Sequence, residues 1–288
     1  MPSIPHSLKL TCRMIKIEHS VFALPFAYLG AFWAARGWPG WFNLVILTIA
    51  MVAVRSFAMT VNRLADRRFD ADNPRTRERP LVTGELSPRF AWAFTGGCAA
   101  LFVAACALMN PLCLALSPVA LAWSAFYSFT KRFTWLCHFV LGSVLGLAPV
   151  AGWLSVAPQL HLAQALLLLG VTFWVAGFDI LYACQDADFD RGRGLRSIPA
   201  RFGLETALAL SSFSHVNTAL FFLLAGVAGG AGWVYAAAVA AVCGVLVWEH
   251  TLIKPDDLSR VNLAFFTLNG VIAVGLFAGL LLDLFLKS

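Results

Sequence analysis

Charged side chains are scarce in this sequence. Asp, Glu, Lys and Arg make up 12% of its 288 residues, whereas hydrophobic residues make up 60%. A typical soluble domain is about a quarter charged, so this chain has too few charges to give a soluble fold of its length a polar surface. Apolar runs of about 20 residues instead predict helices that cross a hydrocarbon layer about 30 Å thick. We therefore expect an all-α integral membrane protein.

Clusters of cysteine and histidine are also missing. The seven cysteines and six histidines are dispersed, with no CxxC pair and no two histidines at metal-ligand spacing. This excludes a disulfide framework and a zinc site of the usual spacing, and it predicts that the cysteines are small buried hydrophobes. The first twenty residues lack the apolar core of a cleavable signal peptide and are typical of an amphipathic surface segment.

Polar breaks divide the rest of the chain into nine apolar stretches, which predict nine transmembrane helices. A count of eight remains open if the third and fourth stretches are misread. The stretches are 20–36, 41–62, 89–109, 111–128, 136–155, 161–184, 205–228, 231–250 and 262–285.

The basic residues are distributed asymmetrically. With nine spans, 18 of the 21 lysines and arginines lie on the side that holds the N-terminus. Excess Lys and Arg marks the cytoplasmic side of a membrane. We therefore expect a bacterial inner-membrane protein with its N-terminus and polar loops in the cytoplasm. The same topology explains the net charge of +6 without a nucleic-acid partner.

Acidic residues gather in two short segments, one after the second predicted span and one at the end of the sixth. At about 100° per residue, their spacing places oxygen-bearing side chains in two columns on helix faces. The first column is Asn62, Asp66 and Asp70, on a face shared with Arg55; the second is Asp179, Tyr182, Asp186 and Asp190, with Asp188 pointing elsewhere.

Two facing columns of carboxylates repel each other unless a cation lies between them. Oxygen ligands without His or Cys favour magnesium, and magnesium usually shares its ligand shell with substrate phosphates. Basic side chains that could neutralise a diphosphate occur on the same side, in the segments 75–79, 131–132 and 191–201. The sequence therefore predicts a site for magnesium and a diphosphate.

Three motifs carry a resemblance to a known family. Asn62-x3-Asp66-x3-Asp70 with Arg75-Thr-x2-Arg79-Pro-Leu, and Tyr182-x3-Asp186-x3-Asp190 with Ser197-Ile-Pro, resemble the two signatures of the UbiA superfamily of membrane prenyltransferases. Tyr127-Ser-Phe-Thr-Lys131-Arg132 is similar to the loop after the family's fourth span. The segments Lys16–His19, Leu24–Phe26 and Ile198–Gly203 most resemble bacterial 4-hydroxybenzoate polyprenyltransferases. Arg63 departs from the pattern, because many relatives carry an aspartate there.

The resemblance implies one domain over residues 1–288, with nine helices around a central cavity and cytoplasmic cap loops. It implies transfer of a polyprenyl group from polyprenyl diphosphate to an aromatic acceptor, with two magnesium ions bridging the Asp motifs to the diphosphate. The expected roles are these: Asp66, Asp70, Asp186 and Asp190 as catalytic metal ligands with Asn62; Arg79, Lys131 and Arg132 on the diphosphate; Tyr127, Asp179 and Tyr182 near the substrates; Arg55 or Arg13 on the carboxylate of the acceptor.

The acceptor and the class of protein remain open at this stage. A hydroxybenzoate in ubiquinone biosynthesis is the first expectation, a naphthoate in menaquinone biosynthesis the second, and haem farnesylation the third. A phosphatidyltransferase would carry a denser single Asp motif than this chain has. A transporter would place its charged groups near the bilayer midplane, whereas the Asp columns lie at helix ends.

Overall fold

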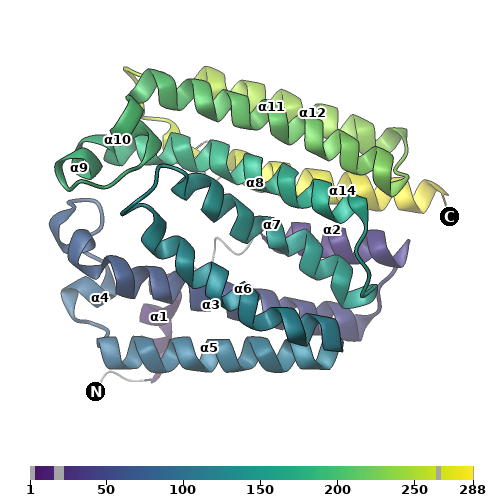
Figure 1. Ribbon diagram of the computed structural model, residues 1–288, viewed down its shortest axis with the longest axis horizontal. Coiled ribbons are helices and arrows are strands. Elements are labelled where there is room, and N and C mark those ends of the chain that lie inside the picture. The colour runs from purple at the N-terminus through teal and green to yellow at the C-terminus, as the bar shows by residue number, and fades with distance from the viewer. Residues whose placement is uncertain (1–3, 16–22, 264–266, 288) are drawn as a thin grey trace.

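The structure is a computed structural model that describes residues 4–15, 23–263 and 267–287, and it is a bundle of helices (Figure 1). Within these ranges the only β-type pairing is an isolated bridge between Lys254 and Asp257. The expected all-α class is confirmed. The elements are α1 (Ile4–Ile15), α2 (Leu24–Ala35), α3 (Trp41–Asp72), α4 (Pro80–Thr83), α5 (Pro88–Met109), α6 (Pro111–Thr130), α7 (Cys137–Val156), α8 (Leu162–Ala183), η2 (Cys184–Asp186), α9 (Ala187–Gly192), α10 (Ile198–Phe202), α11 (Leu204–Gly229), α12 (Trp233–Leu252), α13 (Val261–Leu263) and α14 (Asn269–Lys287).

Eight of the described helices are long and apolar enough to cross a membrane. The third and fourth predicted stretches are two separate helices, α5 and α6, which meet at Asn110. The first predicted span, 20–36, contains α2, which has 12 residues. At 1.5 Å per residue, such a helix is too short by itself to cross about 30 Å. The predicted count of nine is therefore not confirmed, and the reason is the length of α2.

Helix α3 extends beyond the apolar stretch that predicted it. The stretch ends at residue 62, but the helix has 32 residues and continues to Asp72. It ends where Asn73 adopts an extended conformation before Pro74, as expected because the residue before a proline disfavours the helical region. The first acidic column therefore lies on the same rigid helix as the span below it.

Helix α8 lies between α7 and α11, and it is the most enclosed of the candidate spans (Figure 1). Helix α2 packs on α7, α3 on α5, and α12 on α14. The largest buried side chains of the core are aromatic and come from four helices: Phe26, Trp33, Trp174, Phe222 and Tyr235. The second acidic column thus stands on a helix that is held from both sides.

The contact between α7 and α8 depends on glycines. A Cβ atom on Gly142 would lie 2.2 Å from the backbone oxygen of Thr172, and one on Gly146 would lie 2.7 Å from that of Leu168. Small residues allow helix backbones to approach closely in membranes. Gly142 and Gly146, a GxxxG pair on α7, therefore form a helix-packing motif.

Gly142→Ala is therefore expected to destabilise the protein. The added methyl group has no space, and overpacking of this kind costs about 1–3 kcal/mol. Gly97→Ala is the matched control, since nothing lies within 4 Å of the Cβ position on this residue of α5. Thermal unfolding in detergent should show a lower Tm for the first variant only. Equal Tm values for the two variants would contradict the packing role of Gly142.

The short helices α4, α9 and α10 gather at one end of the bundle, and α14 ends at the opposite end (Figure 1). Helix α1 packs near the first group, with Leu10 and Met14 buried against Leu81 and Leu86. The amphipathic segment expected at the N-terminus thus rests its apolar side on protein. These elements form the cap over the polar residues described next.

Candidate active site

The two oxygen-bearing columns face one cavity of about 220 Å³, which we call the polar cavity. Asn62, Asp66 and Asp70 reach it from α3. Asp179 and Tyr182 reach it from α8, Asp186 from η2 and Asp190 from α9. All the predicted site residues line this cavity except Arg55 and Arg13, the two candidates for the acceptor carboxylate. The prediction that the two segments share one interior is confirmed.

The second column does not lie on one continuous helix, because the helix is interrupted between Tyr182 and Asp190. Helix α8 tightens into the 3-10 turn η2 at residues 184–186 and resumes as α9. Asp186 and Asp190 stay buried through this break, at 8% and 1% exposure. The side chain of Asp188 is 97% exposed and pairs with Arg191. As predicted from the spacing, Asp188 points away from the cavity.

Each of four carboxylates in the polar cavity faces a basic side chain. Arg132 lies 3.2 Å from Asp66, Arg79 2.6 Å from Asp70 and Lys131 2.7 Å from Asp190, while Arg75 pairs with Asp186. We call Asp66, Asp70, Asp186 and Asp190 the four paired aspartates. These basic partners offset the repulsion expected between the two columns, because each of the four carboxylates lies next to a positive charge.

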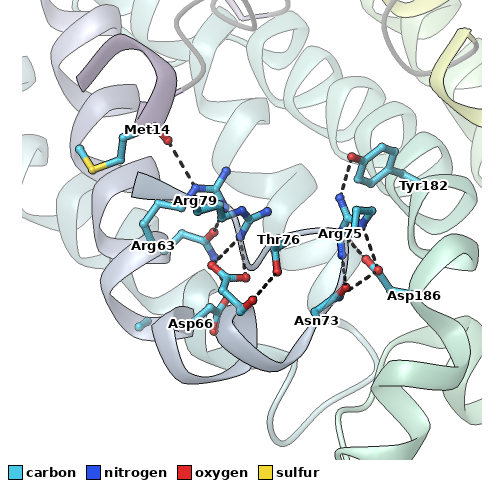
Figure 2. A network of polar contacts seen from close by, with 12 residues as sticks. Met14, Arg63, Asp66, Asn73, Arg75, Thr76, Arg79, Tyr182 and Asp186 are labelled. Carbon is cyan, nitrogen blue, oxygen red and sulfur yellow. Dashed lines mark hydrogen bonds and ion pairs between the residues drawn. The ribbon is translucent and has the colours of Figure 1, made fainter. Parts of the chain in front are cut away.

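The segment after α3 carries Arg75 across the cavity to the second column (Figure 2). Arg75 donates from Nε to Asp186 Oδ1 at 3.0 Å and from Nη1 to the Tyr182 hydroxyl at 2.9 Å. Asn73 donates to the same carboxylate at 3.2 Å. Burial by itself lowers the pKa of Arg75, but the hydrogen bond and the charge of Asp186 outweigh it and raise that pKa. Arg75 therefore stays charged and ties the two columns together.

Lys131 and Arg132 come from the turn after α6 and reach different columns. Burial alone lowers the pKa of Lys131, but the charge of Asp190 and its hydrogen bond raise it more. Arg132 also donates to the backbone oxygen of Ala65 at 2.7 Å. The two adjacent basic residues therefore place one cation at each side of the cavity.

Arg63 and His138 are among the cavity residues that were not recognised from the sequence as part of the site. Arg63 is 7% exposed, lines the cavity and donates to Asn62 Oδ1 at 3.2 Å and to the backbone oxygen of Met14 at 3.4 Å (Figure 2). Its place directly after the motif asparagine Asn62 is the sequence signal that could have identified it. His138 contacts Asp179, and an isolated histidine offered no signal.

Below the polar cavity lies a second one of about 120 Å³, which we call the apolar cavity. Tyr127 and Leu141 line both cavities. Arg55 is the one charged side chain among the described residues that line the apolar cavity. A third cavity of about 150 Å³ continues it and shares the lining residues Phe102 and Leu147. Polar and apolar spaces thus follow one another between α3, α5, α6 and α7.

Arg13, the other residue expected to bind the acceptor, lies elsewhere. Its side chain is 56% exposed and 3.8 Å from Glu85, and it lines neither the polar nor the apolar cavity. Its place on α1 therefore does not support that role. Residues Lys16–His19, part of the resemblance noted above, lie outside the described residues.

Residues 23–271 match the UbiA prenyltransferase family. The chain belongs to this family. Among curated relatives, the 4-hydroxybenzoate octaprenyltransferase of Azoarcus sp. (strain BH72) is 33% identical, with 96% of each chain covered. The protein of the same name from Sodalis glossinidius is 30% identical, covering 95% of this chain and 94% of the relative.

Solved structures agree with the family assignment. A UbiA homolog from Aeropyrum pernix K1 superposes with a TM-score of 0.83 and 35% identity, covering 93% of this chain and 98% of the other. A UbiA homolog from Archaeoglobus fulgidus, bound to DMAPP and Mg²⁺, has a TM-score of 0.75 at 22% identity, with 95% and 98% covered. As a member of this family, with eight long apolar helices, the protein is integral to a membrane.

The oxygen donors of the polar cavity fit the magnesium chemistry expected of a UbiA protein. Carboxylates and an amide oxygen are the ligands that hard divalent cations prefer. Within the described ranges, no three Asp, Glu, His or Cys side chains converge closely enough to hold a metal ion as they stand. The four paired aspartates face their basic partners instead. Binding of a cation would therefore require some of these ion pairs to open.

Proposed function

We propose that this protein transfers a polyprenyl group from polyprenyl diphosphate to 4-hydroxybenzoate, with Mg²⁺, in ubiquinone biosynthesis. The observation that carries the proposal is the cavity of four paired aspartates, which adjoins an apolar space whose described lining residues include one arginine, Arg55. The names of relatives 30–33% identical over nearly the whole chain support the choice of acceptor.

Magnesium would be held by the four paired aspartates together with Asn62. The bound metal would supply positive charge to the diphosphate and so stabilise it as it leaves. All of these side chains line the polar cavity, and their oxygen atoms match magnesium in kind. The predicted roles of these five residues stay a proposal, and Asp186→Asn tests the metal role of one of them.

With magnesium bound, the basic partners of the four paired aspartates would contact the diphosphate instead of the carboxylates. An arginine or lysine whose carboxylate held the metal would become available next to the site of the diphosphate. Arg75, Arg79, Lys131 and Arg132 would therefore hold the oxygens that gain charge as the allylic C–O bond breaks. Each of the four paired aspartates would therefore face a cation both with and without the metal.

The cavities below would separate the two organic substrates from water. An allylic cation reacts with water unless the site excludes it. The apolar cavity and the third cavity would hold the prenyl chain between α3, α5, α6 and α7. Arg55, the charged residue on the wall of the apolar cavity, would bind the carboxylate of the acceptor. Tyr127, on both walls, would lie beside the reacting atoms, as Tyr182 would beside the diphosphate.

We further propose that the whole chain, 1–288, forms one domain in the cytoplasmic membrane of a bacterium. The bacterial relatives and the full-length matches support this placement. The polar cavity would open to the cytoplasm, because the cap segments around it carry most of the basic residues.

The test is a product assay with purified, detergent-solubilised protein. Geranyl diphosphate, Mg²⁺, 4-hydroxybenzoate and a naphthoate acceptor are incubated together, and products are identified by mass spectrometry. We expect prenylated 4-hydroxybenzoate and free diphosphate, and no product after addition of EDTA. Prenylation of the naphthoate alone would assign the protein to menaquinone biosynthesis instead. Folded protein that forms no product and releases no diphosphate would contradict the proposal.

A further inference from the structure

Asp179 has a different kind of partner from the four paired aspartates. Its carboxylate lies 2.7 Å from Nδ1 of His138, measured from Oδ2. Among the described residues, it is the aspartate of the polar cavity that faces a histidine rather than an arginine or lysine. The side chain of His138 is 3% exposed and that of Asp179 is 25% exposed. The histidine is therefore enclosed by protein, whereas the carboxylate is accessible from the polar cavity.

The hydrogen bonds of His138 define its protonation. Its second ring nitrogen, Nε2, lies 3.2 Å from the backbone N–H of Ile198. A backbone N–H can only donate, so Nε2 must accept and carries no hydrogen. His138 is therefore neutral, and its single N–H, on Nδ1, donates to Asp179. Ser197, next to Ile198, donates to Asp190 at 2.6 Å, which anchors the segment that orients the ring.

This partner gives Asp179 a neutral hydrogen-bond donor where each of the four paired aspartates has a positive charge. A full positive charge next to a carboxylate disfavours its protonation strongly, whereas one hydrogen bond from a neutral donor does so less. The four paired aspartates each have such a charge. Within the described part of the cavity, Asp179 is the aspartate whose carboxylate is not engaged in an ion pair with an arginine or lysine.

Asp179 also lies at the depth where a proton would be released. It precedes Asp186 by seven residues, which is about 10–12 Å along α8 and the 3-10 turn η2. Arg55 precedes Asn62 by the same seven residues on α3, which is about 10 Å. A ring whose carboxylate meets Arg55, below a diphosphate held at the level of Asp186, would therefore lie at the level of Asp179.

We infer that Asp179 is the base that removes the proton from the aromatic ring, and that His138 positions it. The inference rests on the proposed function. As the C–O bond breaks, its electron pair leaves with the diphosphate, and a ring π pair forms the new C–C bond. The C–H bond at that ring carbon then breaks. Its electron pair restores the aromatic ring, and its proton moves to a carboxylate oxygen of Asp179.

The test compares 4-hydroxybenzoate with a form deuterated at the two ring positions next to the hydroxyl group. Removal of a general base typically costs about 10²–10⁴-fold in rate, so Asp179→Asn should lose at least 10²-fold in kcat. Loss of the ring proton should then limit the rate, and the isotope effect on kcat should rise above that of the wild type. The KM for geranyl diphosphate should not change. Asp188→Asn, the same substitution on an exposed residue nearby, should behave as the wild type.

His138 provides a second variant. The amide group of glutamine can accept from one partner and donate to another, so His138→Gln should keep most of the activity. His138→Leu removes both hydrogen bonds and should lower kcat without changing the KM for geranyl diphosphate. A rise in the isotope effect for His138→Leu but not for His138→Gln would support positioning of Asp179 by His138.

The outcomes separate this inference from the function on which it rests. A wild-type protein that forms no prenylated acceptor would overturn the proposed function. A wild-type protein that prenylates the ring, with Asp179→Asn folded and its isotope effect unchanged, would overturn the role of Asp179 alone. Full activity of Asp179→Asn would likewise overturn the role of Asp179 as the base.

Discussion

Asp186→Asn is expected to lower kcat/KM for polyprenyl diphosphate by about 10³-fold, with little change in the fold. The carboxylate of Asp186 accepts from Arg75 and Asn73 and is a proposed ligand of magnesium. Asparagine keeps the shape but loses the charge, so the metal should bind more weakly. The Mg²⁺ concentration that gives half-maximal activity should rise, as measured by release of diphosphate.

A double variant separates the metal from the ion pair. Asp186→Asn leaves Arg75 without the carboxylate that it contacts, and the freed charge could by itself disturb the site. Asp186→Asn with Arg75→Gln removes both charges. Arg75→Gln alone is the control, because Arg75 is itself proposed to hold the diphosphate. If Asp186 binds the metal, the Mg²⁺ concentration for half-maximal activity rises in the double variant but not in Arg75→Gln. Equal Mg²⁺ requirements of these two variants would show that Asp186 serves only to hold Arg75.

Lys131→Met is expected to lower kcat by about 10²–10³-fold, the range for loss of a preorganised charge on a developing anion. Lys131 is charged, because Asp190 raises its pKa, and it lines the polar cavity. Methionine keeps the length of the side chain but has no charge for the departing diphosphate. Single-turnover measurements with geranyl diphosphate would show the loss in the chemical step.

Lys131→Arg is the charge-conserving control, and it should retain much more activity than Lys131→Met. Stability needs a separate control, because Asp190 is 1% exposed and loses its cation in Lys131→Met. Lys131→Met with Asp190→Asn should recover the Tm but not the activity. Activity of Lys131→Met within tenfold of the wild type would contradict a role for Lys131 on the diphosphate.

The sequence predicted the membrane fold and much of the polar cavity because both depend on periodicity. Low charge and long apolar runs predicted the spans, and eight of the nine are confirmed as long helices. A spacing of four residues predicted that Asp66 and Asp70 share a face, and they line one cavity with Asp186 and Asp190. Such arguments need only local geometry, which the order of residues determines.

The partners of these residues could not be predicted, because they depend on the path of the loops. Arg75 meets Asp186, from which 111 positions separate it. His138 meets Asp179 across 41 positions. Nothing near His138 in the sequence marks it, since both its partners come from other segments. The length of α2 was also missed, because hydropathy does not show where a helix begins within an apolar stretch.

The ion pairs of the four paired aspartates bear on how the chain is made. Polypeptides enter the membrane before any metal or substrate reaches them, and a cluster of unbalanced charges at a helix end would oppose that step. Here the arginines and the lysine come from the same chain. Assembly in the bilayer can therefore be complete before loading with metal, unlike in small zinc domains that fold only with their ion. Chelation should then stop turnover and leave the folded protein intact.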